Sequence, residues 1–244
     1  GTAQTGTYTI SMKLTDFSSS FASKSLTIDV NFLTNTVNYD YFNIQDNVIT
    51  GLSDEYKNLE TKPEVLIIPG KSKEGNVPLS IGDGDEIRKI STFNGLSSSI
   101  VIIKEGLTSI GSWAFRNCSN LTSITIPEGV TSIEDSTFDG CSSLTSITIP
   151  EGVTSIGSSA FHNCSSLTSA TVPSSVTSMG AYAFDLCSSL KYIHLQGNLN
   201  SSYSLSGTWV KTNDANEPSS WTPTVKSMQT AGYYHQQSAW ESAT

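Results

Sequence analysis

Three consecutive segments are near copies of one another: CSNLTSITIPEGVTSIEDSTFDG (118–140), CSSLTSITIPEGVTSIGSSAFHN (141–163) and CSSLTSATVPSSVTSMGAYAFDL (164–186). A fourth start, CSSLKYIHLQG, follows at 187–197. The first residues of these segments, Cys118, Cys141, Cys164 and Cys187, are each 23 residues apart. Fixed self-similarity at such a period is typical of a repeat array, in which each unit packs on its neighbours.

One repeat predicts its own inside and outside. In the segment 141–163, apolar and polar residues alternate up to Pro150, which indicates a short strand that proline ends. Turns follow at Gly152 and Gly157, and Asn163 suits a left-handed turn before the next repeat. We expect the inward side chains to be Cys141, Leu144, Ile147, Ile149, Val153, Ile156, Ala160 and Phe161.

The repeat region extends in both directions with decreasing regularity. Residues 95–195 form the array, because Gly95–Asn117 is a divergent repeat in register with the others. Residues 37–94 read as an N-terminal cap with a hairpin at 41–50 and a degenerate first repeat at 64–94. Residues 196–244 are polar with scattered aromatics and indicate a C-terminal cap or tail.

Residues 1–36 carry two alternating strand patterns, at Tyr8–Leu14 and Leu26–Val30, separated by the turn cluster DFSSS. This β-hairpin resembles the last hairpin of immunoglobulin-like or cadherin-like modules. Two strands cannot form a sandwich, so the hairpin is either a remnant of such a domain or packs on a neighbour.

The pattern CSSLTSITIPEGVTSIGSSAF resembles the BspA-like, or treponemal type, leucine-rich repeat, closely over 95–195 and loosely over 41–94. The resemblance implies a mainly β, right-handed leucine-rich-repeat solenoid with 23-residue repeats. It also implies a bacterial or protozoan protein at the cell surface or secreted, often an adhesin. It brings no catalytic residues.

Composition excludes several classes of function. The net charge is −9 and no Lys/Arg run exists, which argues against binding to nucleic acid or an anionic membrane. No apolar run approaches the ~18 residues of a transmembrane helix. The N-terminal residues have no charged-then-apolar signal segment, so the sequence itself neither indicates nor excludes export. We expect a monomer.

Four cysteines in one chain could indicate disulfides or a metal site, but their positions in the repeats favour neither. Equal spacing stacks them one per repeat, with parallel side chains whose Cβ atoms lie slightly too far apart for a disulfide. A straight row also cannot form the tetrahedron that zinc needs. We expect buried free thiols and no metal or other cofactor.

The sequence offers no catalytic constellation. Its histidines are His162, His194 and His235, and none has nucleophile partners at a supporting spacing. Asp83, Asp85 and Glu86 in GDGDE predict a solvated acidic loop rather than a calcium site, because the later bidentate Glu of an EF-hand is missing. We therefore expect no enzyme.

Two surfaces are candidate binding sites. The first is the outward face of the main strands, at Ser123, Thr125, Ser146, Thr148, Ser169, Thr171, Tyr192 and His194. The second is the variable edge at the turn around each Phe, at Trp113, Arg116, Asp135, Asp139, His162, Tyr182 and Asp185. Neither surface needs a binding role. The first could be an ordinary solvated surface of β-compatible residues, and the side chains of the second could simply pack within the turns.

These observations favour a non-enzymatic surface protein for adhesion, whose repeat face binds a host or microbial surface protein. One alternative is a glycan-binding module that uses tail tryptophans, which requires Trp209, Trp221 or Trp240 to be exposed. Another alternative is a rigid spacer that displays a further domain.

Overall fold

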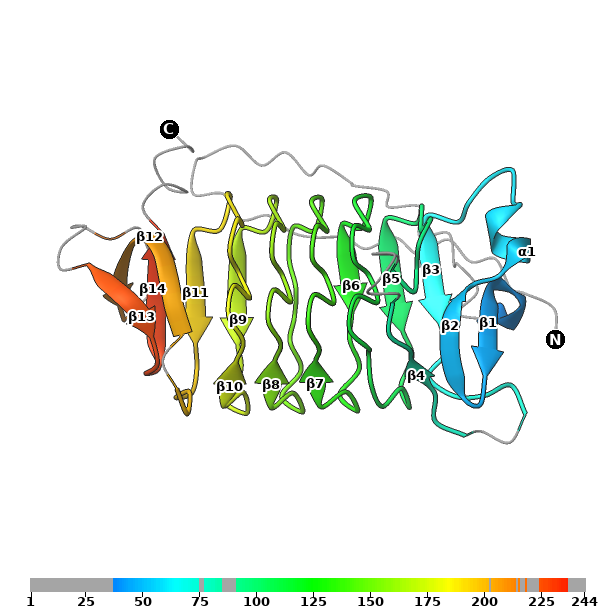
Figure 1. Cartoon of the computed structure of the whole chain (residues 1–244), viewed down its shortest axis with the longest axis horizontal. Helices are drawn as coiled ribbons and strands as arrows, with labels where there is room; N and C mark the ends of the chain where they lie inside the picture. The colour runs from blue at the N-terminus through cyan, green and yellow to red at the C-terminus, as the bar shows by residue number, and fades with distance from the viewer. Residues whose placement is uncertain are drawn as a thin grey trace, which may run out of the picture. The chain divides into compact units, whose positions relative to one another are not determined.

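The computed structural model describes residues 37–74, 77–84, 91–201, 203–213, 215, 218 and 224–236. From Asn38 on, these residues belong to one compact unit, which is mainly β (Figure 1). The hairpin expected at residues 1–36 lies outside the described residues. No helix in the described part of the chain is long and apolar enough to cross a membrane.

The unit begins with a hairpin. The 3-10 helix η1 (Tyr39–Tyr41) leads into β1 (Phe42–Gln45), which pairs antiparallel with β2 (Val48–Leu52). Asp46 and Asn47 turn the chain with φ of 48° and 64°, values that Asp and Asn tolerate better than most residues. The hairpin predicted at 41–50 is therefore confirmed. The short helix α1 (Asp54–Lys57) follows, and its N-cap Ser53 accepts a hydrogen bond from the Tyr56 amide.

The main strands stack in parallel. They are β3 (Val65–Ile68), β5 (Ile100–Ile103), β6 (Ser123–Thr125), β9 (Ser169–Val172) and β11 (Tyr192–Leu195). Ile100 pairs with Ser123, and Ser169 pairs with Tyr192, so the register repeats the 23-residue period. The repeat 141–163 has no main strand of its own, and only a bridge between Thr148 and Thr171 joins it to β9.

A second set of short parallel strands lies after the turn that ends each main strand. It comprises β4 (Ser80–Ile81), β7 (Ser132–Ile133), β8 (Ser155–Ile156) and β10 (Ser178–Met179). Strands β7, β8 and β10 pair in parallel, and bridges through Ile110 connect β7 back to β4. β4 pairs with β2, so this set begins on the N-terminal hairpin.

The core is a set of columns that run through the stack. All eight side chains predicted to point inward in the repeat 141–163 are buried, at 7% exposure or less, which confirms that prediction. The phenylalanines stack ring on ring from Phe93 to Phe184, with centroid separations of 4.6, 5.4, 5.4 and 5.1 Å. Each ring thus completes the burial of its neighbour, which one repeat alone cannot do.

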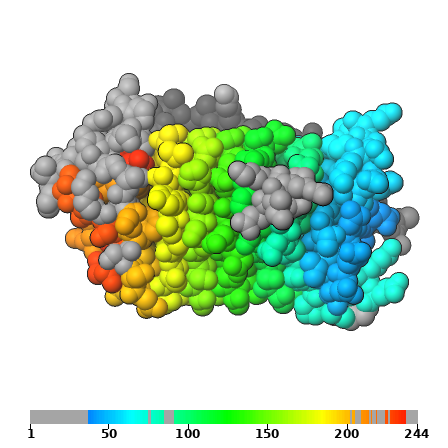
Figure 2. Space-filling model, viewed as in Figure 1, coloured from blue at the N-terminus to red at the C-terminus, as the bar shows by residue number. Residues whose placement is uncertain are grey.

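The C-terminal strands close one end of the stack. They are β12 (Tyr203–Thr212), β13 (Val225–Met228) and β14 (Gly232–Gln236). β14 pairs antiparallel with β11, and β12 pairs with both β13 and β14. The Tyr203 hydroxyl accepts a hydrogen bond from the Phe184 amide at 3.1 Å, which joins β12 to the backbone of the last phenylalanine in the column. Figure 2 shows the repeats as successive bands of colour that end at these strands.

Candidate functional site

The turn before each Cys has the same backbone in every repeat. We call the segments 111–117, 134–140, 157–163 and 180–186 the turn edge. Two positions in each segment adopt a left-handed conformation, with φ between 53° and 75°: Trp113, Ser136, Ser159 and Tyr182 at the first position, and Asn117, Gly140, Asn163 and Leu186 at the second. The left-handed turn expected at Asn163 is thereby confirmed.

A hydrogen-bond ladder holds this conformation. The amides of Trp113, Phe115 and Asn117 donate to carbonyls of the next repeat at 3.1, 2.9 and 2.7 Å. The same positions donate across the next interface, for example Phe138 to Ala160 at 2.8 Å. Because the neighbouring backbones bond to the turn, it has the same conformation although different side chains stand at its left-handed positions.

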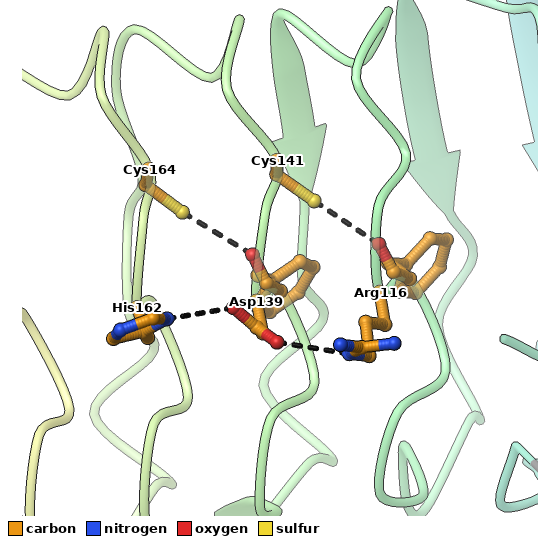
Figure 3. A network of polar contacts seen from close by, with 7 residues as sticks. Arg116, Asp139, Cys141, His162 and Cys164 are labelled. Atoms are coloured by element: carbon orange, nitrogen blue, oxygen red, sulfur yellow. Dashed lines mark hydrogen bonds and ion pairs between the residues drawn. The ribbon is translucent and has the colours of Figure 1, made fainter. Parts of the chain in front are cut away.

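A polar row crosses three repeats of the turn edge. The Asp139 carboxylate accepts a hydrogen bond from Arg116 Nε at 2.9 Å and faces His162 Nδ1 at 2.8 Å (Figure 3). The carboxylate can only accept, so Nδ1 of His162 carries the hydrogen. Their side chains are 18%, 16% and 31% exposed, in the order Arg116, Asp139, His162. The structure thus brings three of the predicted edge residues into contact.

The aromatic edge residues differ in how they are packed. The guanidinium carbon of Arg116 lies 4.6 Å from the centroid of the Trp113 ring, and Trp113 is half-buried. Tyr182 occupies the matching position in the last repeat, but it is 64% exposed, and nearby Leu186 is 62% exposed. Sequence reasoning named Tyr182 and missed Leu186, whose replacement of an Asn or Gly at the same turn position was the available signal.

The remaining edge residues take part in the turn itself. Asp135 Oδ1 accepts a hydrogen bond from the Ser158 amide at 2.6 Å. The Asp185 amide donates to the Tyr182 carbonyl at 3.1 Å, and the Asp185 carbonyl accepts from the Asn163 amide. In the acidic loop, Asp83 Oδ1 likewise accepts from the Ser112 amide at 2.7 Å, whereas Asp85 and Glu86 lie outside the described residues.

The second predicted surface lies along the main strands. We call Ser123, Thr125, Ser146, Thr148, Ser169 and Thr171 the hydroxyl face. Ser123 and Ser169 are half-buried and the other four residues are exposed. In the next strand of the sheet, Tyr192 and His194 pair with Ser169 and Thr171. The predicted residues Ser169 and Thr171 of β9 therefore lie beside Tyr192 and His194 of β11.

An aromatic cluster ends the hydroxyl face. Tyr233 of β14 pairs with His194, and their rings stack at 4.0 Å with an interplanar angle of 4°. Tyr192 lies 5.6 Å from Tyr233 at 62° and 5.7 Å from the buried His235 at 49°. Burial lowers the pKa of His194, because desolvation disfavours its charged form.

Sequence reasoning placed sugar-stacking aromatics elsewhere, on tail tryptophans. Trp209 is buried, at 4% exposure, and Trp221 and Trp240 lie outside the described residues. The alternation of Tyr233 and His235 in GYYHQ was the signal for a strand with an aromatic face.

The cysteines are free thiols inside the stack, as expected. Cys141 Sγ donates to the Phe115 carbonyl at 3.1 Å, and Cys164 Sγ donates to the Phe138 carbonyl at 3.2 Å (Figure 3). Burial raises the pKa of Cys118 and of Cys187 to about 12. A protonated, buried thiol is a poor nucleophile and metal ligand. The described residues contain no group of three His, Cys, Asp or Glu side chains placed to hold a metal ion.

Comparisons with known proteins bear on the repeats. The family model described as BspA type leucine rich repeat region matches residues 86–206, in six copies. A comparison with curated proteins found no match.

Two solved structures share the architecture. A leucine-rich repeat protein of T. pallidum is 23% identical, with a TM-score of 0.54, and the alignment covers 65% of this chain and 71% of that one. A leucine-rich repeat protein from Bacteroides ovatus is 32% identical, with a TM-score of 0.50 over 63% of this chain. This chain spans only 38% of the length of the Bacteroides protein.

Proposed function

Since this chain is a BspA-like leucine-rich repeat protein, we propose that it is a non-enzymatic adhesion protein that binds a protein partner through its turn edge. Leucine-rich repeats of this type are protein-interaction modules. The proposed partner is a surface protein of a host or of another microbe, and the proposed location is the cell surface or the extracellular space. The chain is proposed to act as a monomer.

The observation that carries the proposal is the pair of exposed side chains in the last repeat. Left-handed backbone costs an ordinary L-residue roughly 1–2 kcal/mol, and a bulky side chain is rare there. The repeats 118–140 and 141–163 place only Ser, Asn or Gly at these positions, and the repeat 95–117 has Trp113 and Asn117. The last repeat has a bulky residue at both positions, Tyr182 and Leu186. Both side chains stay more than 60% exposed, so burial in the fold does not offset the cost. A binding role accounts for them.

The chemistry of the rest of the edge agrees with a protein partner. Trp, Tyr and Arg are the residues that most often dominate protein interfaces. Trp113 and Arg116 already pack on each other, which lowers the entropy cost of ordering them in a complex. Asp139 holds the Arg116 side chain from the next repeat. The edge therefore offers one pre-ordered anchor pair and one exposed apolar pair.

The finer architecture is part of the proposal. The repeats 95–195 would form a right-handed solenoid with a 23-residue period, between an N-terminal cap at 37–94 and a C-terminal cap at 196–244. The 23-residue register from β5 to β6 and from β9 to β11 supports this division, as does the pairing of β14 with β11. Residues 1–36 remain a proposed hairpin or partial immunoglobulin-like module.

Binding to intact cells tests the function. Fluorescent chain would be incubated with cultured epithelial cells, and bound fluorescence would be titrated by flow cytometry. The variant Tyr182→Ser with Leu186→Asn gives the last turn the residues that Ser159 and Asn163 supply one repeat earlier, so the fold is kept. We expect at least a tenfold loss of affinity, the size of about 1.4 kcal/mol.

The matched control is Ser136→Ala with Ser159→Ala, which changes the same positions where they carry small side chains, and it should bind like wild type. Brief trypsin treatment of the cells should abolish binding if the partner is a protein. Equal binding of the Tyr182 and Leu186 double variant would contradict the proposal.

A further inference from the structure

We propose that the hydroxyl face, together with Tyr192, His194 and Tyr233, is a binding site for an extended, neutral glycan. This site uses different segments of each repeat from the turn edge, so it stands or falls separately from the protein-binding function.

The first argument is that the hydroxyls of this face are not used within the fold. In the neighbouring column, the hydroxyls of Thr122, Thr145 and Thr168 each donate to a carbonyl of the preceding repeat, at 2.9, 3.3 and 3.4 Å. Among the described residues, none of the six hydroxyls of the face has such a bond. Each can both donate and accept, which is also what a sugar hydroxyl does.

The second argument is spacing and charge. The face has two rows, Ser123, Ser146 and Ser169 in one and Thr125, Thr148 and Thr171 in the other. Where main-chain pairing joins neighbouring repeats, as at Thr148 and Thr171, the backbones lie roughly 4.8 Å apart, an interval close to the length of one pyranose in a linear glycan. The two rows consist of Ser and Thr only and carry no charge, although acidic side chains are common elsewhere in the chain. An anionic glycan would find no cation in these rows.

The third argument is the aromatic end. The faces of sugar rings carry C–H groups that pack on aromatic rings, and tyrosine adds a hydroxyl for hydrogen bonding. Tyr192 is tilted at 62° to Tyr233, so it does not stack face to face with the His194–Tyr233 pair. All three rings are half-buried rather than covered. Desolvation lowers the pKa of His194, which favours the uncharged ring.

A protein would be a poorer occupant of this face. The large apolar side chains that are exposed in the described residues are Val77, Tyr182 and Leu186, and none lies on the hydroxyl face. Protein interfaces need such anchors at their centre, whereas a glycan needs many small polar contacts beside a few rings.

Titration of the whole chain with linear neutral oligosaccharides tests the site. Cellohexaose, chitohexaose, xylohexaose, laminarihexaose and mannohexaose would be followed by calorimetry, with hyaluronan fragments as the anionic probe. We expect at least one neutral oligosaccharide to bind. Tyr192→Ala should then weaken it about tenfold. Thr148→Val with Thr171→Val, which removes hydroxyls without changing shape, should weaken it about fivefold.

The controls separate this site from the turn edge. Tyr182→Ser with Leu186→Asn should leave oligosaccharide affinity unchanged, and circular dichroism would confirm that each variant is folded. Absence of binding by all five neutral oligosaccharides overturns the proposal. So does tighter binding of hyaluronan, binding that survives both the Tyr192 and the threonine variants, or a preference of the face for an uncharged threonine-valine peptide over every oligosaccharide.

Discussion

Phe138 and Ser136 stand two residues apart in one turn, yet the columns to which they belong are filled in opposite ways. The phenylalanine column repeats without change from Phe115 to Phe184, and each ring stacks on the next. The column of Ser136 contains Trp113, Ser159 and Tyr182, although its backbone is equally regular. A ring inside the stack has a neighbour above and below that fixes its size, whereas an edge side chain meets solvent. The interior therefore constrains the sequence, whereas the edge is free to vary from repeat to repeat.

The strongest test of this contrast removes an interior ring. Phe138→Ala should lower the free energy of unfolding by about 3–5 kcal/mol, because it opens a cavity between Phe115 and Phe161. Urea denaturation measures the loss. Ser136→Ala in the same turn should change stability by less than about 0.5 kcal/mol. Comparable losses in the two variants would remove the distinction between interior and edge.

A second test uses pH on neighbouring residues. Cys187 is 2% exposed, and burial raises the pKa of its thiol from 9.0 to about 12. The thiol ionises at a lower pH in the unfolded chain than in the fold. The folded state therefore keeps its full stability below pH 9, and the free energy of unfolding falls as the pH rises from 9 toward 12. Between those values this one thiol should lower the unfolding free energy by about 1.4 kcal/mol per pH unit.

Urea midpoints at pH 8, 9 and 10 would measure this slope in wild type and in Cys187→Ala. In the alanine variant, the free energy of unfolding should fall less steeply with pH, because one ionising thiol is missing. Identical slopes would mean that Cys187 is solvated or does not remain neutral in the fold.

The smallest expected effect has the opposite sign. Leu186→Asn places at the strained turn the residue that Asn117 and Asn163 supply elsewhere, so it should raise the unfolding free energy by up to about 1 kcal/mol. The same change should weaken partner binding. Cys187→Ala, next in the chain, serves as the interior comparison and should destabilise. A loss of stability in Leu186→Asn would show that Leu186 packs in the fold after all.

Much of this architecture can be predicted from the sequence, because the sequence repeats every 23 residues. The buried side chains of one repeat, from Cys141 to Phe161, could be predicted because the apolar residues that alternate with polar ones along the chain are the ones that point inward. The interruption of the main sheet could not be predicted. Residues 121–127 and 144–150 both read LTSITIP, but β6 forms in the first segment and only a bridge at Thr148 forms in the second. Identical residues differ there because pairing depends on neighbouring backbones.

The candidate sites were predicted less completely for a similar reason. The rows of the hydroxyl face follow from period-2 alternation within each repeat. Tyr233 reaches that face only because β14 folds back and pairs with β11, a contact that lies outside the 23-residue period. The exposure of Tyr182 and Leu186 depends on which other segments pack against the last repeat. The sequence of that repeat alone does not predict this packing.

The interrupted sheet also has a mechanical meaning. The hydrogen bonds that join one repeat to the next run along the stack, so a pull between its two ends loads the interfaces in series, like links in a chain. The weakest link then sets the force at which the stack opens. The interface between the repeats 118–140 and 141–163 lacks a main-strand pairing. It is held by the pairing of β7 with β8, the turn ladder and the hydrogen bonds from Thr145 to the Thr122 carbonyl. Under tension, we expect the array to part first beside the repeat 141–163, which has no main strand of its own.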